Sequence, residues 1–118
     1  MKYDVHLAHA AMRELRKLDR PTQGKILTAI EGLETNPRPP GVEKLSGHPD
    51  FFRIRVSDHR VIYAIPRKKV VVVCGVRNRK NAYRQLNMLN STLKSAISEI
   101  ETMGQSPELQ QALTLRKS

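Results

Sequence analysis

The chain has 118 residues, with 21 Lys and Arg against 11 Asp and Glu and a formal net charge of +10 at pH 7. A chain of this length forms one domain with a small core, and its single cysteine, Cys74, excludes an internal disulfide. No stretch approaches the roughly 18 apolar residues of a membrane span, and residues 1–10 lack the apolar segment of a secretion signal, so we expect a cytoplasmic protein without membrane contacts.

The first third of the chain predicts a strand followed by two helices. Tyr3–Leu7 is short and mixed, as expected of an opening strand. Apolar residues then recur every three or four positions from Ala8 to Leu18 and again from Ile26 to Leu33, which is the spacing of two amphipathic helices. Pro21 suits the first turn of the second helix, and the Pro-rich segment after it ends the helical hairpin.

The middle of the chain changes to the alternation typical of strands. Phe52–Val56 alternates apolar residues with arginines, and Arg60–Ile65 follows after a turn at Ser57–His59. A second turn at Pro66–Lys68 leads into Lys69–Val76, whose nearly unbroken apolar run predicts a central strand covered on both faces. The predicted fold is α+β, with the N-terminal strand and two-helix hairpin packed on an antiparallel β-meander.

The last third returns to helical spacing. Apolar residues recur from Leu86 to Met103 as in a long amphipathic helix, and Ser106–Pro107 begins a short final helix to about Leu115. We predict a domain over residues 1–85 and a helical C-terminal extension over 86–118. The apolar stripe of the extension is expected to pack on the body or on a second copy, with binding to a partner as the alternative. The oligomeric state is not indicated.

The excess positive charge lies in the first of these two parts. Residues 1–85 carry 18 Lys and Arg against 8 Asp and Glu, whereas residues 86–118 carry three of each. A basic body with a neutral tail indicates a polyanionic partner for the body alone.

Four arginines are expected at one end or on one face of the meander. Arg53 and Arg55 share a strand face because side chains alternate along a strand. Arg60 begins the next strand, and Arg77 ends the third. Guanidinium groups match phosphate oxygens, and several of them together repel one another in the absence of an anion. The arrangement predicts a phosphate site, with a solvated arginine surface as the alternative.

Several short segments carry a resemblance to a known family. They are Lys44–Gly47, Phe52–Arg55, Arg60–Tyr63 and Val76–Arg84. In this order and spacing they resemble the RelE/ParE toxin superfamily, and in particular its RelE-like mRNA interferase branch, over roughly residues 1–85. The resemblance implies a toxin of a type II toxin–antitoxin system that a cognate antitoxin protein inhibits. It also implies a ribosome-dependent mRNA endoribonuclease that works by ribose 2′-hydroxyl attack, without a metal or cofactor.

The resemblance also implies a catalytic set. Matched residue by residue, it comprises Arg53, Arg55, Arg60, Arg77 and Tyr83. RelE has lysines where this chain has Arg53 and Arg55, and arginine does not transfer a proton, so a mechanism that needs a lysine proton at these positions is in doubt. Tyr83 is then the plausible base, although only about a thousandth of an unperturbed tyrosine is ionised at pH 7. Nearby guanidinium groups would lower its pKa. The alternative for Tyr83 is an aromatic cap over the sheet edge.

Other residues receive lesser roles. Exposed basic side chains are expected to contact RNA at Lys44, Lys68, Lys69, Arg79 and Lys80. His59 is interpreted as a surface histidine, with a catalytic role as the alternative because some relatives use a histidine base. Cys74 is expected to be a packing residue, and the histidines lack metal-ligand spacing.

Two further functions remain open. One is a ParE-like inhibitor of DNA gyrase without nuclease activity, against which the pairing of Arg77 with Tyr83 argues. The other is a protein with the toxin fold that only binds RNA or its antitoxin.

Overall fold

The structure, a computed structural model, describes residues 2–82 and 86–103. Its sheet has the strand order β1-β5-β4-β3-β2. The strands are β1 (Asp4–Leu7), β2 (Glu43–Leu45), β3 (His48–Val56), β4 (His59–Arg67) and β5 (Val70–Asn78). The helical elements are α1 (His9–Arg16), α2 (Arg20–Gly32), the 3-10 turn η1 (Leu86–Met88) and α3 (Leu89–Met103). None of the helices in these ranges is both long and apolar enough to cross a membrane.

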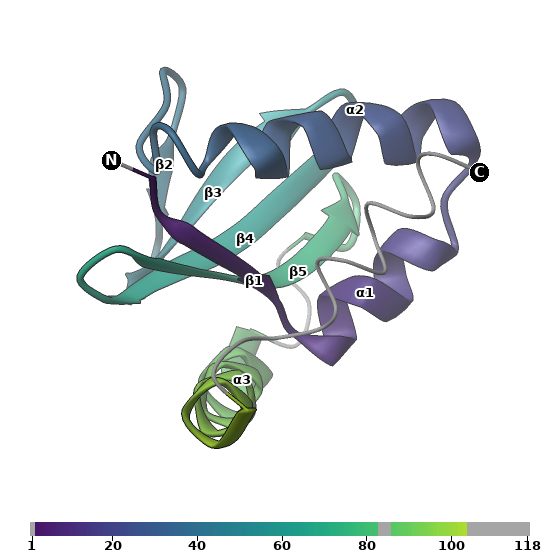
Figure 1. Ribbon diagram of the computed structural model, residues 1–118. Coiled ribbons are helices and arrows are strands. Elements are labelled where there is room, and N and C mark those ends of the chain that lie inside the picture. Colours follow the sequence, from purple (N-terminus) through teal and green to yellow (C-terminus); the bar gives the residue numbers. More distant parts are fainter. Residues whose placement is uncertain (1, 83–85, 104–118) are drawn as a thin grey trace.

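The predicted α+β fold is confirmed. Strands β3, β4 and β5 form the antiparallel meander, and β1 lies parallel to β5 and completes the sheet on that side. Strand β5 lies between β1 and β4, and its residues from Val71 to Val76 are buried, as its apolar run predicted. Helices α1 and α2 lie together on one side of the sheet (Figure 1).

The strands differ from the prediction in several boundaries and in one added strand. Strand β3 begins at His48 instead of Phe52, because the short strand β2, which was not predicted, pairs with it. Strand β4 continues through Pro66 to Arg67, where a shift of register between Ala64 and Arg67 interrupts the pairing with β5. A proline is tolerated at such an irregularity because no ladder hydrogen bond is needed from its nitrogen.

The core on the first face joins the helical hairpin to the sheet. Its buried side chains come from α1 and α2 and from the inward-facing positions of the strands, among them Leu15, Ile30 and Val61. Helix α2 begins as predicted, with Pro21 in its first turn and Asp19 as its N-cap. The Asp19 carboxylate accepts hydrogen bonds from the backbone N–H and the hydroxyl of Thr22, at 3.3 and 2.7 Å.

Helix α3 covers part of the opposite face (Figure 1). Leu89 and Ala96 are buried in a second apolar cluster that also contains side chains of β3, β4 and β5. Two ion pairs add to this contact, His9 Nε2 with Glu99 Oε1 at 2.5 Å and Arg67 with Glu101. Of the alternatives for the apolar stripe, the structure has packing on the body of the same chain. The predicted final helix, residues 106–115, lies outside the described residues.

Candidate functional site

Three arginines form a row across neighbouring strands. Arg55 of β3 lies opposite Arg60 of β4, and Arg60 lies opposite Arg77 of β5. Directly opposed residues on paired strands share a face, with Cβ atoms about 4.5–5.5 Å apart. Arg53 lies two positions before Arg55 and opposite Ile62, a member of the α3 cluster. The arginine row and Arg53 are therefore on the face that α3 partly covers.

The arginines differ in their counter-charges. Arg53 donates to Glu43 Oε2 of β2 at 2.5 Å, and Arg77 Nε lies 3.5 Å from Glu14 Oε2 of α1. Arg60 is only 7% exposed, and the hydrogen bond seen for its guanidinium group goes to the carbonyl oxygen of its neighbour His59, at 3.1 Å. Glutamates thus relieve part of the expected repulsion, and the positive charges that a bound anion would offset are mainly those of Arg55 and Arg60.

Glu14 is a site residue that the sequence analysis missed. Strand β1 pairs with β5 only over Val70–Val73. Beyond that point, the Glu14 side chain of α1 reaches the edge of β5, where Glu14 Oε1 accepts the Val76 N–H at 3.0 Å. Burial raises the pKa of Glu14, and the Val76 N–H and the charge of Arg77 act in the opposite direction. Glu14 lies among other charged residues of α1, such as Arg13 and Arg16, so its position in the sequence did not signal this contact.

Gly75 interrupts the apolar run of β5 at a position where a larger side chain would meet Arg77. A Cβ atom at this position would lie 3.3 Å from Arg77 Nε and 3.5 Å from Glu14 Oε1. The first separation is tighter than an ordinary van der Waals contact. Glycine therefore leaves room for Arg77 and Glu14 to approach each other over the strand.

Hydrogen bonds hold the backbone of the segment that follows β5, residues 79–81. Asn78 Oδ1 accepts from the backbone N–H groups of Lys80 and Asn81, at 2.9 and 3.1 Å. The Arg79 N–H donates to the carbonyl oxygen of Asp58, in the β3–β4 turn, at 2.7 Å. Arg79 and Lys80 are exposed and lie next to the end of the arginine row. Tyr83, the predicted base, lies outside the described residues.

The other predicted RNA contacts are spread over the molecule. Lys68 and Lys69 form the β4–β5 turn, at the opposite end of β5 from Arg77. Eight residues of extended strand separate the two ends by about 26 Å. Lys69 Nζ lies 4.6 Å from the centroid of the Tyr3 ring, and Lys44 is exposed on β2. The structure therefore brings Arg79 and Lys80 to the arginine row but not Lys68 and Lys69.

His59 points away from the arginine row. It is the first residue of β4 and half-buried instead of being a surface turn residue, and as the neighbour of Arg60 it belongs to the other face. On that face its charge acts on Asp19, whose pKa is lowered mainly by the hydrogen bonds from Thr22. Nδ1 of His59 is buried without a hydrogen-bond partner among the described residues.

Cys74 is buried, and burial raises the pKa of its thiol to about 12. The predicted packing role is consistent with this environment. Within residues 2–82 and 86–103, no group of three or more His, Cys, Asp or Glu side chains is placed to hold a metal ion.

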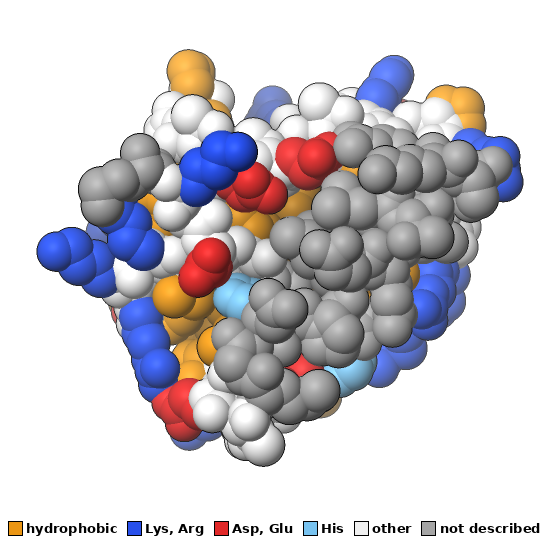
Figure 2. All heavy atoms as spheres, viewed as in Figure 1, with side chains coloured by type: hydrophobic (Ala, Val, Ile, Leu, Met, Phe, Trp, Pro, Cys, Tyr) orange, Lys and Arg blue, Asp and Glu red, His pale blue; other side chains and the backbone are white. Residues whose placement is uncertain are grey.

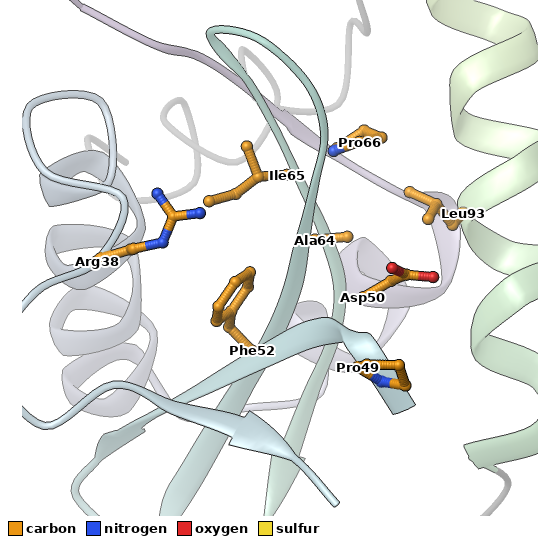
Figure 3. Close-up of a pocket in the computed structure, with 8 residues that line it drawn as sticks. All are labelled: Arg38, Pro49, Asp50, Phe52, Ala64, Ile65, Pro66 and Leu93. Atoms are coloured by element: carbon orange, nitrogen blue, oxygen red, sulfur yellow. The ribbon is translucent and has the colours of Figure 1, made fainter. Parts of the chain in front are cut away.

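A separate hollow lies at the other end of β3 and β4 (Figure 3). Its volume is about 400 Å³, and Arg38, Asp50, Phe52 and Leu93 are among its walls. The Arg38 guanidinium group lies 5.4 Å from the centroid of the Phe52 ring.

In Figure 2, Lys and Arg side chains lie along both sides of the molecule, with acidic side chains between them.

Comparison with known proteins agrees with this architecture. The family described as "ParE toxin of type II toxin-antitoxin system, parDE" matches residues 5–83. A protein named toxin RelE1 from Methanocaldococcus jannaschii is 26% identical over 88 residues, which are 71% of this chain and 98% of the relative. A RelE-like toxin protein from Escherichia coli is 31% identical over 88 residues, which are 70% of this chain and 92% of the relative.

A solved structure has the same fold. The toxin in the crystal structure of the RelE–RelB complex from Pyrococcus horikoshii superposes with a TM-score of 0.60 and 30% identity. The match covers 70% of this chain and all of that one. From the family match, the relatives and the fold, the chain belongs to the RelE/ParE toxin superfamily and is a RelE-like toxin of a toxin–antitoxin system.

Proposed function

We propose that the protein is a ribosome-dependent mRNA endoribonuclease that cleaves by attack of a ribose 2′-hydroxyl on the adjacent phosphate, without a metal. The observation that supports this most is the row of Arg55, Arg60 and Arg77 on adjacent strands. Three permanently charged guanidinium groups on one face form a surface that complements a phosphodiester and the extra negative charge that its phosphorane develops.

The row supplies electrostatic stabilisation and not proton transfer. Arg60 is held by burial, and Arg77 by Glu14, so their positive charges are preorganised before the substrate binds. Preorganised charge in a partly buried site stabilises a developing anion more than the same charge in water. Arg77 is assigned to the phosphorane and to the departing 5′-oxygen, and Arg53 and Arg55 to the phosphate of the bound RNA.

The base is assigned to Tyr83. In the sequence it comes six residues after Arg77, beyond the turn that the Asn78 side chain and the Asp58 carbonyl oxygen hold. Positive charge near a phenol favours the phenolate and lowers its pKa. Tyr83 takes the proton of the 2′-hydroxyl, the 2′-oxygen bonds to phosphorus, and the bond from phosphorus to the 5′-oxygen breaks, with water giving that oxygen a proton. One fragment then ends in a 2′,3′-cyclic phosphate and the other in a 5′-hydroxyl.

The partners follow from this activity. They are the ribosome, mRNA and an antitoxin protein, and the RelE–RelB complexes among the similar structures support the last of these. An enzyme that acts on translating ribosomes would work in the cytoplasm. We also propose that residues 1–85 carry the activity and residues 86–118 form an extension, since the family match ends at residue 83.

A gyrase inhibitor without nuclease activity is the second candidate, because the matching family is described as ParE toxin. The two functions predict different products. The test maps mRNA 5′ ends in a translation extract with and without the purified protein, and analyses the termini of the fragments. Cleavage within codons that leaves 5′-hydroxyl and cyclic or 3′-phosphate ends is expected. Fragments with 3′-hydroxyl and 5′-phosphate ends would contradict the mechanism, and growth arrest without any cleavage would favour the gyrase function.

A further inference from the structure

Arg77 and Tyr83, to which the proposed mechanism assigns the phosphorane and the base, are six positions apart in the sequence. Their chemistry joins a 2′-oxygen to the adjacent phosphate, and such reacting atoms lie about 3–3.5 Å apart when they are aligned for attack. Six residues of extended strand span about 20 Å. A chain that left β5 in a straight line would therefore carry position 83 too far from Arg77 for both side chains to act on one nucleotide.

The chain turns directly after Arg77, and Asn78, the last residue of β5, makes the bonds of this turn. The carbonyl oxygen of Asn78 accepts the N–H of Asn81 at 3.0 Å, as in a β-turn. Its side-chain oxygen Oδ1 accepts the N–H groups of Lys80 and Asn81, at 2.9 and 3.1 Å. An asparagine that accepts the N–H two residues later forms an Asx turn, which holds the change of direction in place.

Two further contacts hold the turn against the body. The Arg79 N–H donates to the carbonyl oxygen of Asp58, in the β3–β4 turn, at 2.7 Å. Ala82 is fully buried, and it directly precedes Tyr83 in the sequence. The chain from the end of β5 to Ala82 is therefore held at its start, its middle and its end.

Asn78 supplies the part of this hold that depends on a side chain. The bond between Arg79 and Asp58 joins two main-chain groups, so it does not depend on which side chains these residues carry. Asn78 is exposed, and its side-chain oxygen bonds the two N–H groups of the turn. A substitution at Asn78 therefore removes bonds of the turn and leaves the apolar core in place.

We propose that Asn78 is a positioning residue that, by holding the turn after β5, sets the position of Tyr83 relative to Arg77. The inference rests on the proposed nuclease function. A displacement of about 1 Å between reacting groups can reduce the rate by about 10²-fold, so bonds that restrict this turn contribute to the rate without touching the RNA. Asn78 then affects the chemical step and not the binding of the ribosome, which the basic side chains carry.

The test measures single-turnover cleavage by the full chain at saturating ribosome concentration, together with ribosome affinity. Asn78→Ala removes the acceptor of two N–H groups and should slow cleavage about 10- to 10²-fold, with an unchanged affinity. Asn78→Ser keeps an uncharged oxygen that accepts the same N–H groups, although more weakly, and should restore part of the rate. An equal loss of rate in both variants, or a loss of affinity in place of rate, overturns the proposal.

Asn36→Ala is the matched control. Asn36 is also an exposed asparagine, and its Oδ1 accepts the N–H of Arg38, two residues later, at 3.1 Å. It lies in the loop between α2 and β2, outside the arginine row. Its replacement removes a turn bond of the same kind and should leave the cleavage rate near the wild-type value. A loss as large as that of Asn78→Ala would show a general loosening of the structure and would count against the proposal.

A double-mutant cycle tests whether Asn78 acts through Tyr83. Asn78→Ala should slow the wild type and should not slow Tyr83→Phe further, because substitutions at coupled residues are not additive. If Asn78→Ala slows cleavage by the same factor in both backgrounds, Asn78 does not act through Tyr83 and the proposal is wrong.

A measurement without RNA separates this proposal from the nuclease proposal. NMR follows the titration of isotope-labelled tyrosine rings, and the signal of Tyr83 is the one that Tyr83→Phe lacks. In the wild type the charge of Arg77 should hold the pKa of Tyr83 below the ordinary value of about 10, and Asn78→Ala should return it toward that value. If this holds but the wild type cleaves nothing, the positioning role stands and the nuclease function fails. If Tyr83 titrates alike in the wild type and in Asn78→Ala, the positioning role is wrong whatever the activity.

Discussion

Arg60 shows how a single residue of this site differs from a surface arginine. Only 7% of its surface is exposed, yet an arginine side chain carries its positive charge wherever it lies in a protein. Burying a charge without a partner is costly, and the described residues give Arg60 only the carbonyl oxygen of His59. A bound phosphate would offset this cost, which is the physical reason to expect an anion at the row.

The first prediction concerns Arg77 and Tyr83, the two residues to which the proposed mechanism assigns the reacting atoms. Arg77→Ala should reduce single-turnover cleavage by about 10²–10³-fold, as expected for one lost preorganised charge. Tyr83→Phe should reduce it by about 10²–10⁴-fold, as expected for a lost general base. Ribosome binding should persist in both variants, because the remaining basic groups carry association. Quench-flow cleavage and ribosome pelleting measure the two quantities.

Arg67→Ala is the matched control for Arg77→Ala, since Arg67 is an exposed arginine at the other end of the sheet. Its cleavage rate should stay within about twofold of the wild type. If Tyr83→Phe cleaves at the wild-type rate, the base lies elsewhere and His59 is tested next, although its face of the sheet is the wrong one.

The second prediction concerns the buried carboxylate of Glu14. Because its pKa is raised above the ordinary 4.5, the folded state holds the proton to a higher pH than the unfolded state. The free energy of unfolding contributed by this group therefore falls as pH rises from about 4.5 through the raised pKa. Glu14→Gln lacks this dependence and still accepts the Val76 N–H.

Urea unfolding between pH 4 and 7 tests this prediction. The wild type should lose stability relative to Glu14→Gln as pH increases, and parallel curves would show that Glu14 is not buried as a charge. Cleavage by Glu14→Gln should also slow, because Arg77 loses its carboxylate partner. Restoring that rate with Glu14→Asp, which keeps the charge, would separate positioning of Arg77 from a general loss of structure.

Individual site residues were predictable only where they follow local rules. Strand alternation and the positions of the turns predicted that Arg53, Arg55, Arg60 and Arg77 lie at one end or on one face of the meander. This was possible because the face of each arginine is set by its position within its own strand. Glu14 approaches Arg77 only when α1 packs along the edge of β5, and no local pattern encodes that approach.

At the level of elements, α3 decides how much of the second face is covered. Its buried side chains pack on Ile62, Val72 and Cys74, and without α3 these would face water. This helix was predictable because its apolar residues recur at helical spacing over many positions. Strand β2 was not, because its three residues, Glu43–Leu45, are too few to show a period.

The third prediction removes this cover. Deletion of residues 86–118 should lower the free energy of unfolding by about 3 kcal/mol or more, since it re-exposes the partners of several apolar side chains that each contribute roughly 1.5–3 kcal/mol when buried. Deletion of residues 104–118 alone is the control that keeps η1 and α3. The comparison is made by thermal and urea unfolding. Equal stability of the two truncated chains and the whole protein would mean that α3 serves a partner and not the body.

On the scale of the whole molecule, charge separates the body from the extension. Arg53 and the arginines of the row are a small part of the basic groups, and further exposed ones lie on α1 and at the start of α2, among them Arg13, Arg16, Lys17 and Arg20. Composition predicts a polyanionic partner for the body, and this stays a prediction. It gave no position for these charges, because exposure depends on how the helices pack.

The last prediction follows from this distribution. RNA binding by basic side chains releases counterions, so the logarithm of the association constant falls linearly with the logarithm of salt, with a slope of about −0.7 to −0.9 per phosphate contact. Six contacts would weaken ribosome binding by about 10³-fold between 50 and 200 mM salt. Replacing Arg13 and Arg16 with glutamine should make the slope shallower by up to about two contacts, while the cleavage rate at saturating ribosome concentration stays near the wild-type value, because neither residue lies in the arginine row. Pelleting and single-turnover cleavage across a salt series give both numbers. An affinity that does not change with salt would show that the basic surface is not the contact, and a slope unchanged in the double variant would place the contact away from α1.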